Sequence, residues 1–543
     1  MLRHRELFST CARLCLAGLL ASCASFDDAD SGSADPDTDL ATSDVLRASG
    51  DHTTLALTAD GLVRGVETAT MRAFRGIPYA AAPVDELRWR PPVRHARWHD
   101  ILDATQFANH CPQAASPFGR ESATEDCLFL NVYAPRHAVL RPVMVWIHGG
   151  ALVTGESDDY DPTRLVEQGD VLVVTINYRL GALGFLAHPA LSAGSPDHTS
   201  GNYGLMDQQE ALRWVHRNIL LFGGDPSRVT IFGESAGGLS VHEQLVAPGS
   251  QGLFQRAIVE SGAYQLTQPS LATGEVLGFA FATRAGCIDQ SAACLRGLSV
   301  AQVLASQAGG TSGASPVIDG TFLPRSVGAA FASGQFNHVP VMEGANHDEW
   351  RLFVGETELV TGPVTAQTYP AAIQATLGVP AALVPLFAAQ YPLASFPSPA
   401  LAVSALGTDA IFACNARFAA QKLSQFVPTF AYEFNDEAAP ERFLPPVSFP
   451  YGAAHASELQ YLFDLPVAVP APPLDAAQQQ LSEAMIDYWT TFARTGQPSS
   501  FHTPSWTRFA ADQDTMQSLV PATPRPETSF ATDHNCAFWD ALR

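Results

Sequence analysis

The chain has 543 residues, of which 46% are hydrophobic and only 16% charged, so it can bury a large core. Its formal net charge of −23 argues against nucleic acid as a partner, because another polyanion would be repelled. Length alone suggests three or four domains of roughly 150 residues each, but large α/β enzymes often form a single domain.

The N-terminus has the features of an export signal. Residues 1–22 start with scattered arginines and continue with a short apolar stretch at 14–21. This stretch is too short to span a bilayer as a mature helix. The signal ends Leu20-Ala21-Ser22-Cys23, which resembles the lipobox of bacterial lipoproteins. The sequence therefore predicts cleavage before Cys23 and lipidation of that cysteine; an ordinary cleaved signal with an incidental cysteine is the alternative.

The segment that follows the signal is acidic and poor in large apolar side chains. Residues 23–51 interleave aspartates with Ser, Ala and Gly, and such a segment cannot bury enough apolar surface to fold. We expect a flexible acidic tether here. The chain is thus predicted to be exported, either as a periplasmic or outer-membrane/cell-surface lipoprotein attached to the membrane through Cys23, or as a secreted protein.

The cysteines also indicate export. Three of the nine lie in the leader, which leaves an even set of six: Cys111, Cys127, Cys287, Cys294, Cys414 and Cys536. An even set in an oxidising compartment predicts disulfides, whereas six free thiols would fit a cytosolic protein better. Six cysteines allow 15 connectivities, so the sequence alone leaves the pairing open.

The middle of the chain alternates strand-like and helix-like segments. Residues 143–147, 171–176 and 229–232 are apolar runs typical of buried strands, and 208–221 shows apolar residues at helical spacing. This alternation predicts an α/β protein with a mostly parallel sheet covered by helices on both faces.

Farther on, residues 429–434 are predicted to form another strand. Residues 475–494 are predicted to form a helix, capped by Asp475 and ended by Gly496. Residues 363–402 are dense in Pro and Ala, which fits an irregular helical insertion beside the sheet.

A nucleophile elbow is the most informative motif. The segment Gly233-Glu234-Ser235-Ala236-Gly237 reads G-x-S-x-G directly after the strand at 229–232. The two glycines allow a sharp turn, which would leave Ser235 at its tip with a helix N-terminus beneath it. A helix N-terminus favours negative charge, which suits an oxyanion formed beside Ser235.

A serine nucleophile needs a base, an acid that orients the base, and donors for the oxyanion. The loop His148-Gly149-Gly150-Ala151 follows a strand and could supply backbone donors together with Ala236. Glu349 follows a strand-like run at 339–344, and His455 lies in a small-residue loop entering the helix-like segment 456–463. From the residues alone, His148 and His347 compete with His455, and Asp348 competes with Glu349.

The chain resembles the type-B carboxylesterase and cholinesterase family of α/β-hydrolases over nearly all of residues 52–543. The motifs that carry this resemblance are Gly76-Ile77-Pro78-Tyr79, Leu87-Arg88-Trp89-Arg90-Pro91-Pro92, Glu125-Asp126-Cys127-Leu128-Phe129-Leu130-Asn131, Asn177-Tyr178-Arg179-Leu180-Gly181, Gly201-Asn202-Tyr203-Gly204-Leu205, Phe222-Gly223-Gly224-Asp225-Pro226, Tyr488-Trp489 and Cys536-Ala537-Phe538-Trp539. The resemblance implies a single α/β-hydrolase domain over 52–543, with a mostly parallel central sheet and helical insertions over the active site.

Residue by residue, the family pattern implies Ser235 as nucleophile, Glu349 as acid and His455 as base. It also implies an oxyanion hole at Gly150, Ala151 and Ala236, and an acidic supporting position beside the nucleophile at Glu234. The pairing it implies for the cysteines is 111–127, 287–294 and 414–536, and Arg88 with Glu125 resembles a structural ion pair.

Three positions depart from the family pattern. Ala151 stands where the third glycine of the oxyanion loop is usual, and is followed by Leu152 where an aromatic residue is common. Trp350 follows Glu349 where glycine is usual, which predicts a reshaped loop around the acid Glu349 (residues 347–350, the acid loop). The 111–127 loop contains no Trp, so the cation–π partner of choline is missing and we discount choline esters.

The sequence thus predicts a serine carboxylesterase that acts on a small-molecule ester through an acyl-enzyme intermediate. It needs no metal and no organic cofactor, and no oligomeric state is predicted. The alternatives are a specialised hydrolase for a bulky or polyacid ester or an amide, and a non-catalytic adhesion or binding relative.

Overall fold

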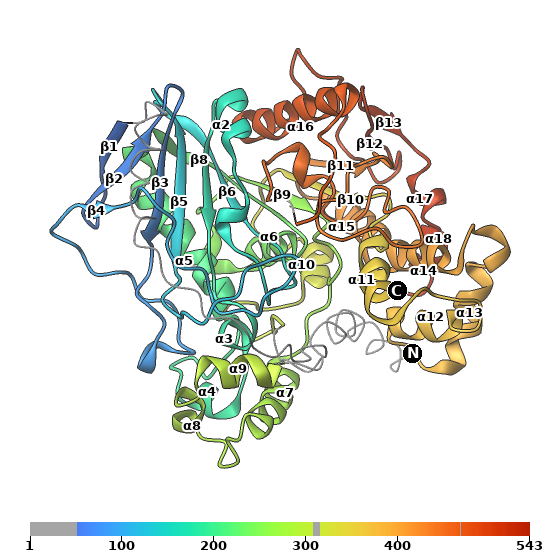
Figure 1. Cartoon of the computed structure of the whole chain (residues 1–543), viewed down its shortest axis with the longest axis horizontal. Coiled ribbons are helices and arrows are strands. Elements are labelled where there is room, and N and C mark those ends of the chain that lie inside the picture. Colours follow the sequence, from blue (N-terminus) through green and yellow to red (C-terminus); the bar gives the residue numbers. More distant parts are fainter. Residues whose placement is uncertain (1–51, 308–314, 467) are drawn as a thin grey trace, which may run out of the picture.

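The computed structural model describes residues 52–307, 315–466 and 468–543. The predicted signal peptide 1–22, Cys23 and the tether 23–51 lie outside the described residues. The described chain is organised around one 13-stranded sheet with the order β1-β2-β3-β5-β7-β6-β8-β9-β10-β11-β12-β13, in which β4 pairs with β2 (Figure 1).

The strands are β1 (His52–Leu57), β2 (Leu62–Glu67), β3 (Met71–Pro78), β4 (Leu102–Asp103), β5 (Phe129–Pro135), β6 (Arg141–Ile147), β7 (Leu172–Ile176), β8 (Gly224–Glu234), β9 (Arg256–Glu260), β10 (Val341–Asn346), β11 (Thr429–Phe434), β12 (Met516–Leu519) and β13 (Arg525–Glu527).

The α-helices are α2 (Thr163–Gly169), α3 (Gly181–Phe185), α4 (Pro189–Ala193), α5 (Tyr203–Asn218), α6 (Ala236–Val246), α7 (Leu271–Arg284), α8 (Ala292–Arg296), α9 (Val300–Gln307), α10 (Val327–Ser333), α11 (Arg351–Thr361), α12 (Tyr369–Leu377), α13 (Val384–Gln390), α14 (Pro399–Gly407), α15 (Cys414–Leu423), α16 (Ala476–Thr495), α17 (Phe530–Asp533) and α18 (Cys536–Asp540).

The centre of the sheet is parallel and its edges are antiparallel. Strands β7, β6, β8, β9, β10, β11 and β12 pair in parallel in that order. On one side β1, β2, β3 and β5, and on the other side β13, pair antiparallel along the sheet, while the short β4 pairs in parallel with β2. The four strands predicted at 143–147, 171–176, 229–232 and 429–434 all form. The α/β-hydrolase sheet expected from the sequence is therefore present.

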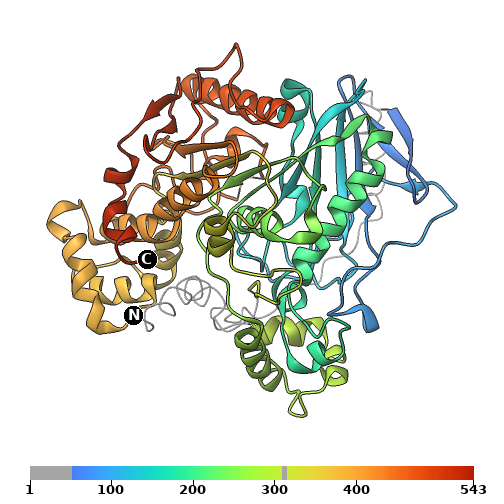
Figure 2. The ribbon, with the colours of Figure 1, turned by 180° about the vertical axis from the view of Figure 1, so that it is seen from behind.

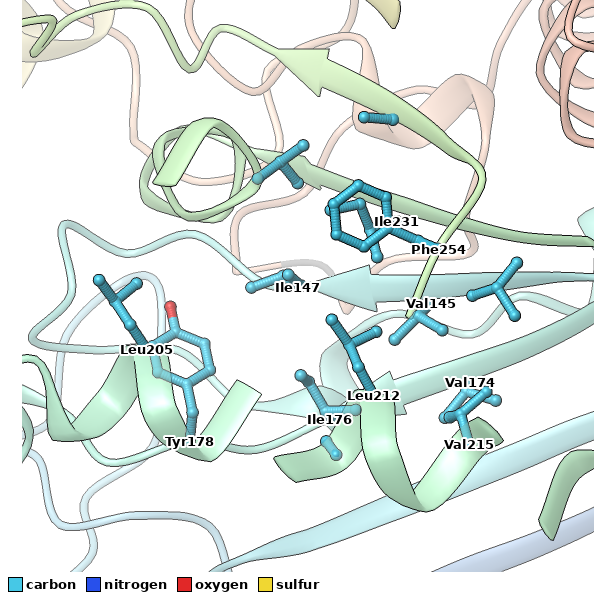
Figure 3. Packing of buried hydrophobic residues seen from close by; sticks show 14 of the residues in the cluster. Val145, Ile147, Val174, Ile176, Tyr178, Leu205, Leu212, Val215, Ile231 and Phe254 are labelled. Carbon is cyan, nitrogen blue, oxygen red and sulfur yellow. The ribbon is translucent and has the colours of Figure 1, made fainter. Parts of the chain in front are cut away.

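Alternate residues of the central strands fill two separate cores. On β6, Val143, Val145 and Ile147 pack in one core, while Met144 and Trp146 pack in the other. Successive side chains of a strand point to opposite faces, so a strand buried on both faces needs apolar residues throughout. Figure 3 shows the first core, in which Leu212 and Val215 of α5 lie against Val145, Val174 and Ile176.

The second core lies under α16 and α2. Leu481, Met485 and Trp489 of α16 pack on it together with Trp146 and Phe232. Asp475 caps α16 through the backbone N–H groups of residues 477 and 478, and Gly496 ends the helix with φ 78°, as the sequence predicts. Opposite faces of the sheet are thus covered by α5 and α16.

Two groups of helices project beyond the sheet. Figures 1 and 2 show α7, α8 and α9 in one lobe and α12 and α13 in another. The second lobe confirms the helical insertion predicted at 363–402. The segment Pro399–Leu423 is apolar and long enough to cross a membrane, but most of it is buried in the fold, which is typical of a core helix.

The six cysteines form three disulfides with the pairing that the family resemblance implies. Cys111 bonds to Cys127, Cys287 to Cys294, and Cys414 to Cys536. Three disulfides fit an oxidising, extracytoplasmic compartment. Arg88 pairs with Glu125 (Nε–Oε2 2.7 Å) and also donates from Nη1 to the carbonyl of Arg296 at 3.0 Å, so its role is structural.

The longest and the shortest of the three disulfide loops differ greatly in length, which gives a stability prediction. Cys414 and Cys536 are 122 residues apart, and Cys287 and Cys294 only 7. Because the stabilisation grows with the loop that is closed in the unfolded chain, the double variant Cys414→Ser/Cys536→Ser should lose about 5 kcal/mol and the control Cys287→Ser/Cys294→Ser about 2 kcal/mol. Denaturant unfolding of both variants measures the difference; equal losses would contradict the prediction.

Candidate active site

Ser235 occupies a strained turn between β8 and α6. β8 ends at Glu234 and α6 begins at Ala236, and Ser235 between them has φ 56° and ψ −120°. A non-glycine residue rarely adopts a positive φ, and such strain is characteristic of functional turns. The backbone N–H of Ser235 donates to the carbonyl of Glu260 on β9 at 2.8 Å, which holds the turn in place.

The elbow is pressed against the end of β6. A Cβ on Gly237 would lie 1.9 Å from the carbonyl oxygen of Ile147, and one on Gly233 would lie 2.5 Å from the same oxygen. Both positions therefore require glycine for close approach of two backbones. The contact brings the loop that follows β6 next to Ser235.

That loop is the predicted source of oxyanion donors. A Cβ built on Gly149 would lie 3.2 Å from Ser235 Cβ, so the loop and the nucleophile are adjacent. Gly150, Ala151 and Leu152 have φ angles of 91°, 54° and 63°. The left-handed conformation costs an alanine roughly 1–2 kcal/mol relative to the right-handed one, so Ala151 keeps a conformation that glycine would adopt more easily. Leu152 is buried.

Glu349 and His455 lie side by side. His455 Nδ1 is 2.6 Å from Glu349 Oε2, and the backbone N–H of His455 donates to the carbonyl of Glu349 at 3.3 Å. The backbone N–H of Asn346, the last residue of β10, donates to Glu349 Oε1 at 2.8 Å. Both oxygens of Glu349 are thus engaged, and its carboxylate is fixed against the imidazole.

The helix expected directly after His455 does not form. Ala456 has φ 66°, which interrupts any right-handed helix at once, and only a 3₁₀ turn at Leu459–Tyr461 follows. The prediction of a helix-like segment at 456–463 was therefore wrong. The small residues on the other side, Ala453 and Ala454, are buried.

The imidazole of His455 reaches the nucleophile elbow. His455 Nε2 lies 3.1 Å from Glu234 Oε1, and Glu234 directly precedes Ser235. Nδ1 of His455 thus contacts Glu349, and Nε2 contacts Glu234 at the elbow. Glu234, named from the sequence as a supporting acid, is in contact with the imidazole itself.

The competing histidines and acid are engaged elsewhere. His148 is buried, stacks on Tyr178 with 4.5 Å between ring centroids, and its burial lowers its pKa to about 4. Asp348 Oδ2 accepts from the backbone N–H of Ala453 at 3.0 Å, and Asp348 Oδ1 pairs with Arg351 at 2.7 Å. His347 lies 3.2 Å from Asp348 Oδ1. Of the candidate pairs, it is His455 with Glu349 that also contacts the elbow, through Glu234.

Two further carboxyls, the buried Glu458 and the half-buried Glu356, interact electrostatically with His455, and neither was predicted from the sequence. Glu458 accepts from the side-chain N–H of Asn346 at 2.5 Å, and burial together with the charge of Glu349 raises its pKa to about 7. Burial also raises the pKa of Glu356 on α11 to about 7. Their positions, three residues after His455 and seven after Glu349, were the only available signal.

These carboxyls set the protonation of the imidazole. Burial lowers the pKa of His455, but the charges of Glu234 and Glu349 outweigh it and raise that pKa to about 9. Burial likewise raises the pKa of Glu234 to about 8. A negative neighbour favours the charged imidazolium, which is the form that follows proton abstraction from a nucleophile.

Comparison with known proteins places this geometry in a family. The model of the carboxylesterase family matches residues 52–539. The chain belongs to the carboxylesterase family. It is similar to acylcarnitine hydrolase of Mus musculus (36% identical over 487 residues, 84% of this chain and 85% of the relative) and to para-nitrobenzyl esterase of Bacillus subtilis strain 168 (33% over 491 residues, 86% and 94%). Fumonisin B1 esterase of Sphingopyxis macrogoltabida is 39% identical over 313 residues, 56% of this chain and 58% of the relative.

Trp350, which follows Glu349 where the carboxylesterase pattern usually has glycine, packs against Gly407. A Cβ on Gly407 would lie 2.2 Å from Trp350 Cγ, so the indole fills the space that this glycine leaves. Trp350 also contacts Phe353 (4.6 Å between centroids). Phe353 and Phe412 lie 5.1 and 4.9 Å from the ring of His455, so Trp350 supports an aromatic wall beside the imidazole.

Because the backbones approach closely at the elbow, adding one methyl group at Gly237 should reduce the stability of the protein markedly. Gly237→Ala should destabilise the protein by about 1–3 kcal/mol or more, because the new Cβ would overlap a backbone oxygen that cannot move without distorting β6. Thermal unfolding measures the loss. Gly297→Ala is the control, since its Cβ would make only ordinary contacts at 3.4 Å. An unchanged melting temperature in Gly237→Ala would contradict the crowded geometry.

Proposed function

We propose that this carboxylesterase is a serine hydrolase in which Ser235, His455 and Glu349 form the catalytic triad. The observation that carries the proposal is the position of His455, with Nδ1 2.6 Å from Glu349 Oε2 and Nε2 beside Glu234 at the elbow. In the proposed triad Glu349 orients the imidazole through Nδ1, and Nε2, on the side of the elbow, acts as the base. Residues 52–543 then form one hydrolase domain.

The reaction proceeds in two acyl transfers. His455 Nε2 takes the proton of Ser235 Oγ as this oxygen forms a bond to the ester carbonyl carbon. The carbonyl electron pair moves onto oxygen, where the N–H groups of Gly150, Ala151 and Ala236 stabilise it. When the tetrahedral intermediate collapses, the bond to the alcohol oxygen breaks and His455 returns the proton to that oxygen. Water then attacks the acyl-enzyme, again with His455 as base, and releases the acid and free Ser235.

The charge of the site favours uncharged acyl groups. Four carboxyls, those of Glu234, Glu349, Glu356 and Glu458, influence His455 or lie beside it. Burial already raises the pKa values of Glu234, Glu356 and Glu458, so a polyanionic acyl group at Ser235 would add negative charge in a place where carboxylates are poorly solvated. We therefore propose neutral carboxylic esters as substrates, ahead of a polyacid ester. Two of the three relatives are named esterases, which agrees with ester hydrolysis.

For the location of the enzyme, we propose export and attachment to the membrane through lipidated Cys23. The three disulfides support an oxidising compartment, and the Leu20-Ala21-Ser22-Cys23 sequence supports lipidation. A tether at 23–51 would then separate the hydrolase domain from the membrane surface.

Removing the nucleophile tests the proposal directly. Ser235→Ala should lower kcat for p-nitrophenyl acetate on the order of 10⁶-fold, because no other group forms the acyl-enzyme. The wild type should also show a burst of p-nitrophenol when deacylation is slow. Ser333→Ala, an exposed serine at the end of α10, is the control and should retain full activity. A folded wild type without turnover, or an active Ser235→Ala variant, would refute the triad and leave binding as the function.

The pH dependence tests the role of Glu234. Since His455 must be neutral to act as a base, kcat/KM should rise with pH through the raised pKa of His455. Glu234→Gln removes a charge that favours the imidazolium and should lower this pKa, so that the acid limb of the profile moves about 1–3 pH units towards lower pH. Glu437→Gln, an exposed acid, is the control. An acid limb that stays in place would show that Glu234 does not act on His455.

A further inference from the structure

A second buried histidine lies between two carboxylates, away from Ser235. His534 Nδ1 is 2.8 Å from Asp409 Oδ1, and His534 Nε2 is 2.7 Å from Glu433 Oε1. Glu433 lies on β11, Asp409 in the π-helical turn Thr408–Ala413, and His534 directly after α17. All three side chains are less than 5% exposed. The ester chemistry uses none of them.

A second histidine approaches this group from the acid loop. The ring of His347 lies 5.4 Å from the ring of His534, between centroids. His347, Glu433 and His534 each place one ligand-type atom within 4.8 Å of the others. The side chain of His347 is 31% exposed, so the group is reached from solvent through this residue.

A further carboxyl, that of Glu527 on β13, lies next to Glu433 and interacts with it. Glu527 Oε1 is buried and has no hydrogen-bond partner among the residues that the structure describes. Glu527 lies outside the group of three side chains whose ligand atoms are within 4.8 Å of one another, but it is adjacent to one member of that group. A half-buried carboxylate with an unpaired oxygen is thus available beside Glu433.

We propose that His347, Glu433 and His534, with Glu527 as a fourth ligand, form a binding site for a zinc ion. Two imidazoles with one or two carboxylates are a ligand set that suits Zn²⁺, whereas Ca²⁺ and Mg²⁺ prefer oxygen ligands alone. No motif spacing marks this site, because His347 and Glu433 are 86 positions apart and Glu433 and His534 are 101 positions apart.

The outer contacts of both histidines are those found at metal sites. Asp409 holds Nδ1 of His534, and Asp348 holds Nδ1 of His347 at 3.2 Å. A carboxylate on one ring nitrogen orients the imidazole and increases the basicity of the other nitrogen towards a metal. In this arrangement Nε2 is the nitrogen that each histidine offers to the ion. The two aspartates are thus positioning residues.

Zinc binding requires only small movements within the cluster. Bonds of about 2.0–2.2 Å to a tetrahedral ion place ligand atoms roughly 3.4 Å apart. His534 Nε2 and Glu433 Oε1 would therefore separate slightly from 2.7 Å, while His347 would move inward from the surface. The proton that His534 now shares with Glu433 is released as the ion enters, so the affinity should increase with pH.

The site would connect the acid loop to the C-terminal segment. His347 is two residues before Glu349, and His534 lies two residues before Cys536 of the third disulfide. A metal ion at this point would fix the loop that carries Glu349 to β11, β13 and the end of the chain. The expected role is structural, and it does not depend on which substrate the enzyme hydrolyses.

Zinc titration of the mature protein without a polyhistidine tag tests the proposal. After treatment with a chelator, the protein should bind one Zn²⁺ per chain in calorimetry, and its melting temperature should rise. His347→Gln removes the ligand that lies outside the buried ion triad, so the apoprotein should fold normally, as checked by circular dichroism. It should bind Zn²⁺ at least about 100-fold more weakly. His502→Gln, an exposed histidine, is the control and should bind as the wild type does.

Two outcomes would overturn the site. The first is no binding of Zn²⁺ by the wild type, in which case His534 is simply a charged histidine between two carboxylates. The second is undiminished binding by folded His347→Gln, which would place the ion elsewhere, for example at His110, Glu156 and Asp158. If His347→Gln does not fold, Glu527→Gln on β13 replaces it: weaker binding supports the site and unchanged binding refutes it.

Discussion

The parallel order of β6, β8, β10 and β11 is the constraint on which the active site depends. In a parallel sheet all the strands end at the same edge, so residues far apart in the chain meet there. The loop with Gly150 follows β6, Ser235 follows β8, and Glu349 follows β10. Each needs only a few residues beyond its strand to reach the common space. His455 is the exception, and it is brought in through backbone hydrogen bonds that pair its loop with the acid loop.

Those backbone hydrogen bonds help to explain how Glu349 and His455 can be buried away from solvent. Asp348 donates its backbone N–H to the carbonyl of Ala453 and accepts from the N–H of Ala453 with its side chain, while His455 donates to Glu349. The two loops thus form a short interlocked ladder around the imidazole. Because buried polar groups are stable only when paired, this ladder offsets part of the cost of burying Glu349 and His455. Asp348, a competitor for the acid position by sequence, is instead the residue that joins the loops.

Sequence patterns predicted the elements well where a single local rule decides the conformation. The strands at 143–147 and 429–434 and the capped helix after Asp475 follow from apolar runs and from capping chemistry. The elbow around Ser235 follows from its two glycines. The segment after His455 could not be predicted in this way, because its course depends on the left-handed Ala456, which nothing in the local sequence requires. Glu458 and Glu356 were missed for a related reason: their significance comes from burial beside His455, which only the tertiary fold creates.

The residues around His455 and those around His534 differ in the same respect: motifs predict the first group, and only the tertiary fold reveals the second. Ser235, Glu349 and His455 were predicted from family motifs, because the proposed reaction restricts the residue type at each of these positions. His347, Glu433 and His534 belong to no such motif, and only the adjacency of β10, β11 and the C-terminal segment brings them together. Both clusters nevertheless share one arrangement, an imidazole whose Nδ1 contacts one carboxylate while its Nε2 faces a second. In the proposed mechanism Nε2 of His455 accepts the proton of Ser235, and at the proposed zinc site Nε2 of His534 exchanges its proton for the metal ion. The two sites share the loop 347–349, so a change in the conformation of this short segment affects both of them.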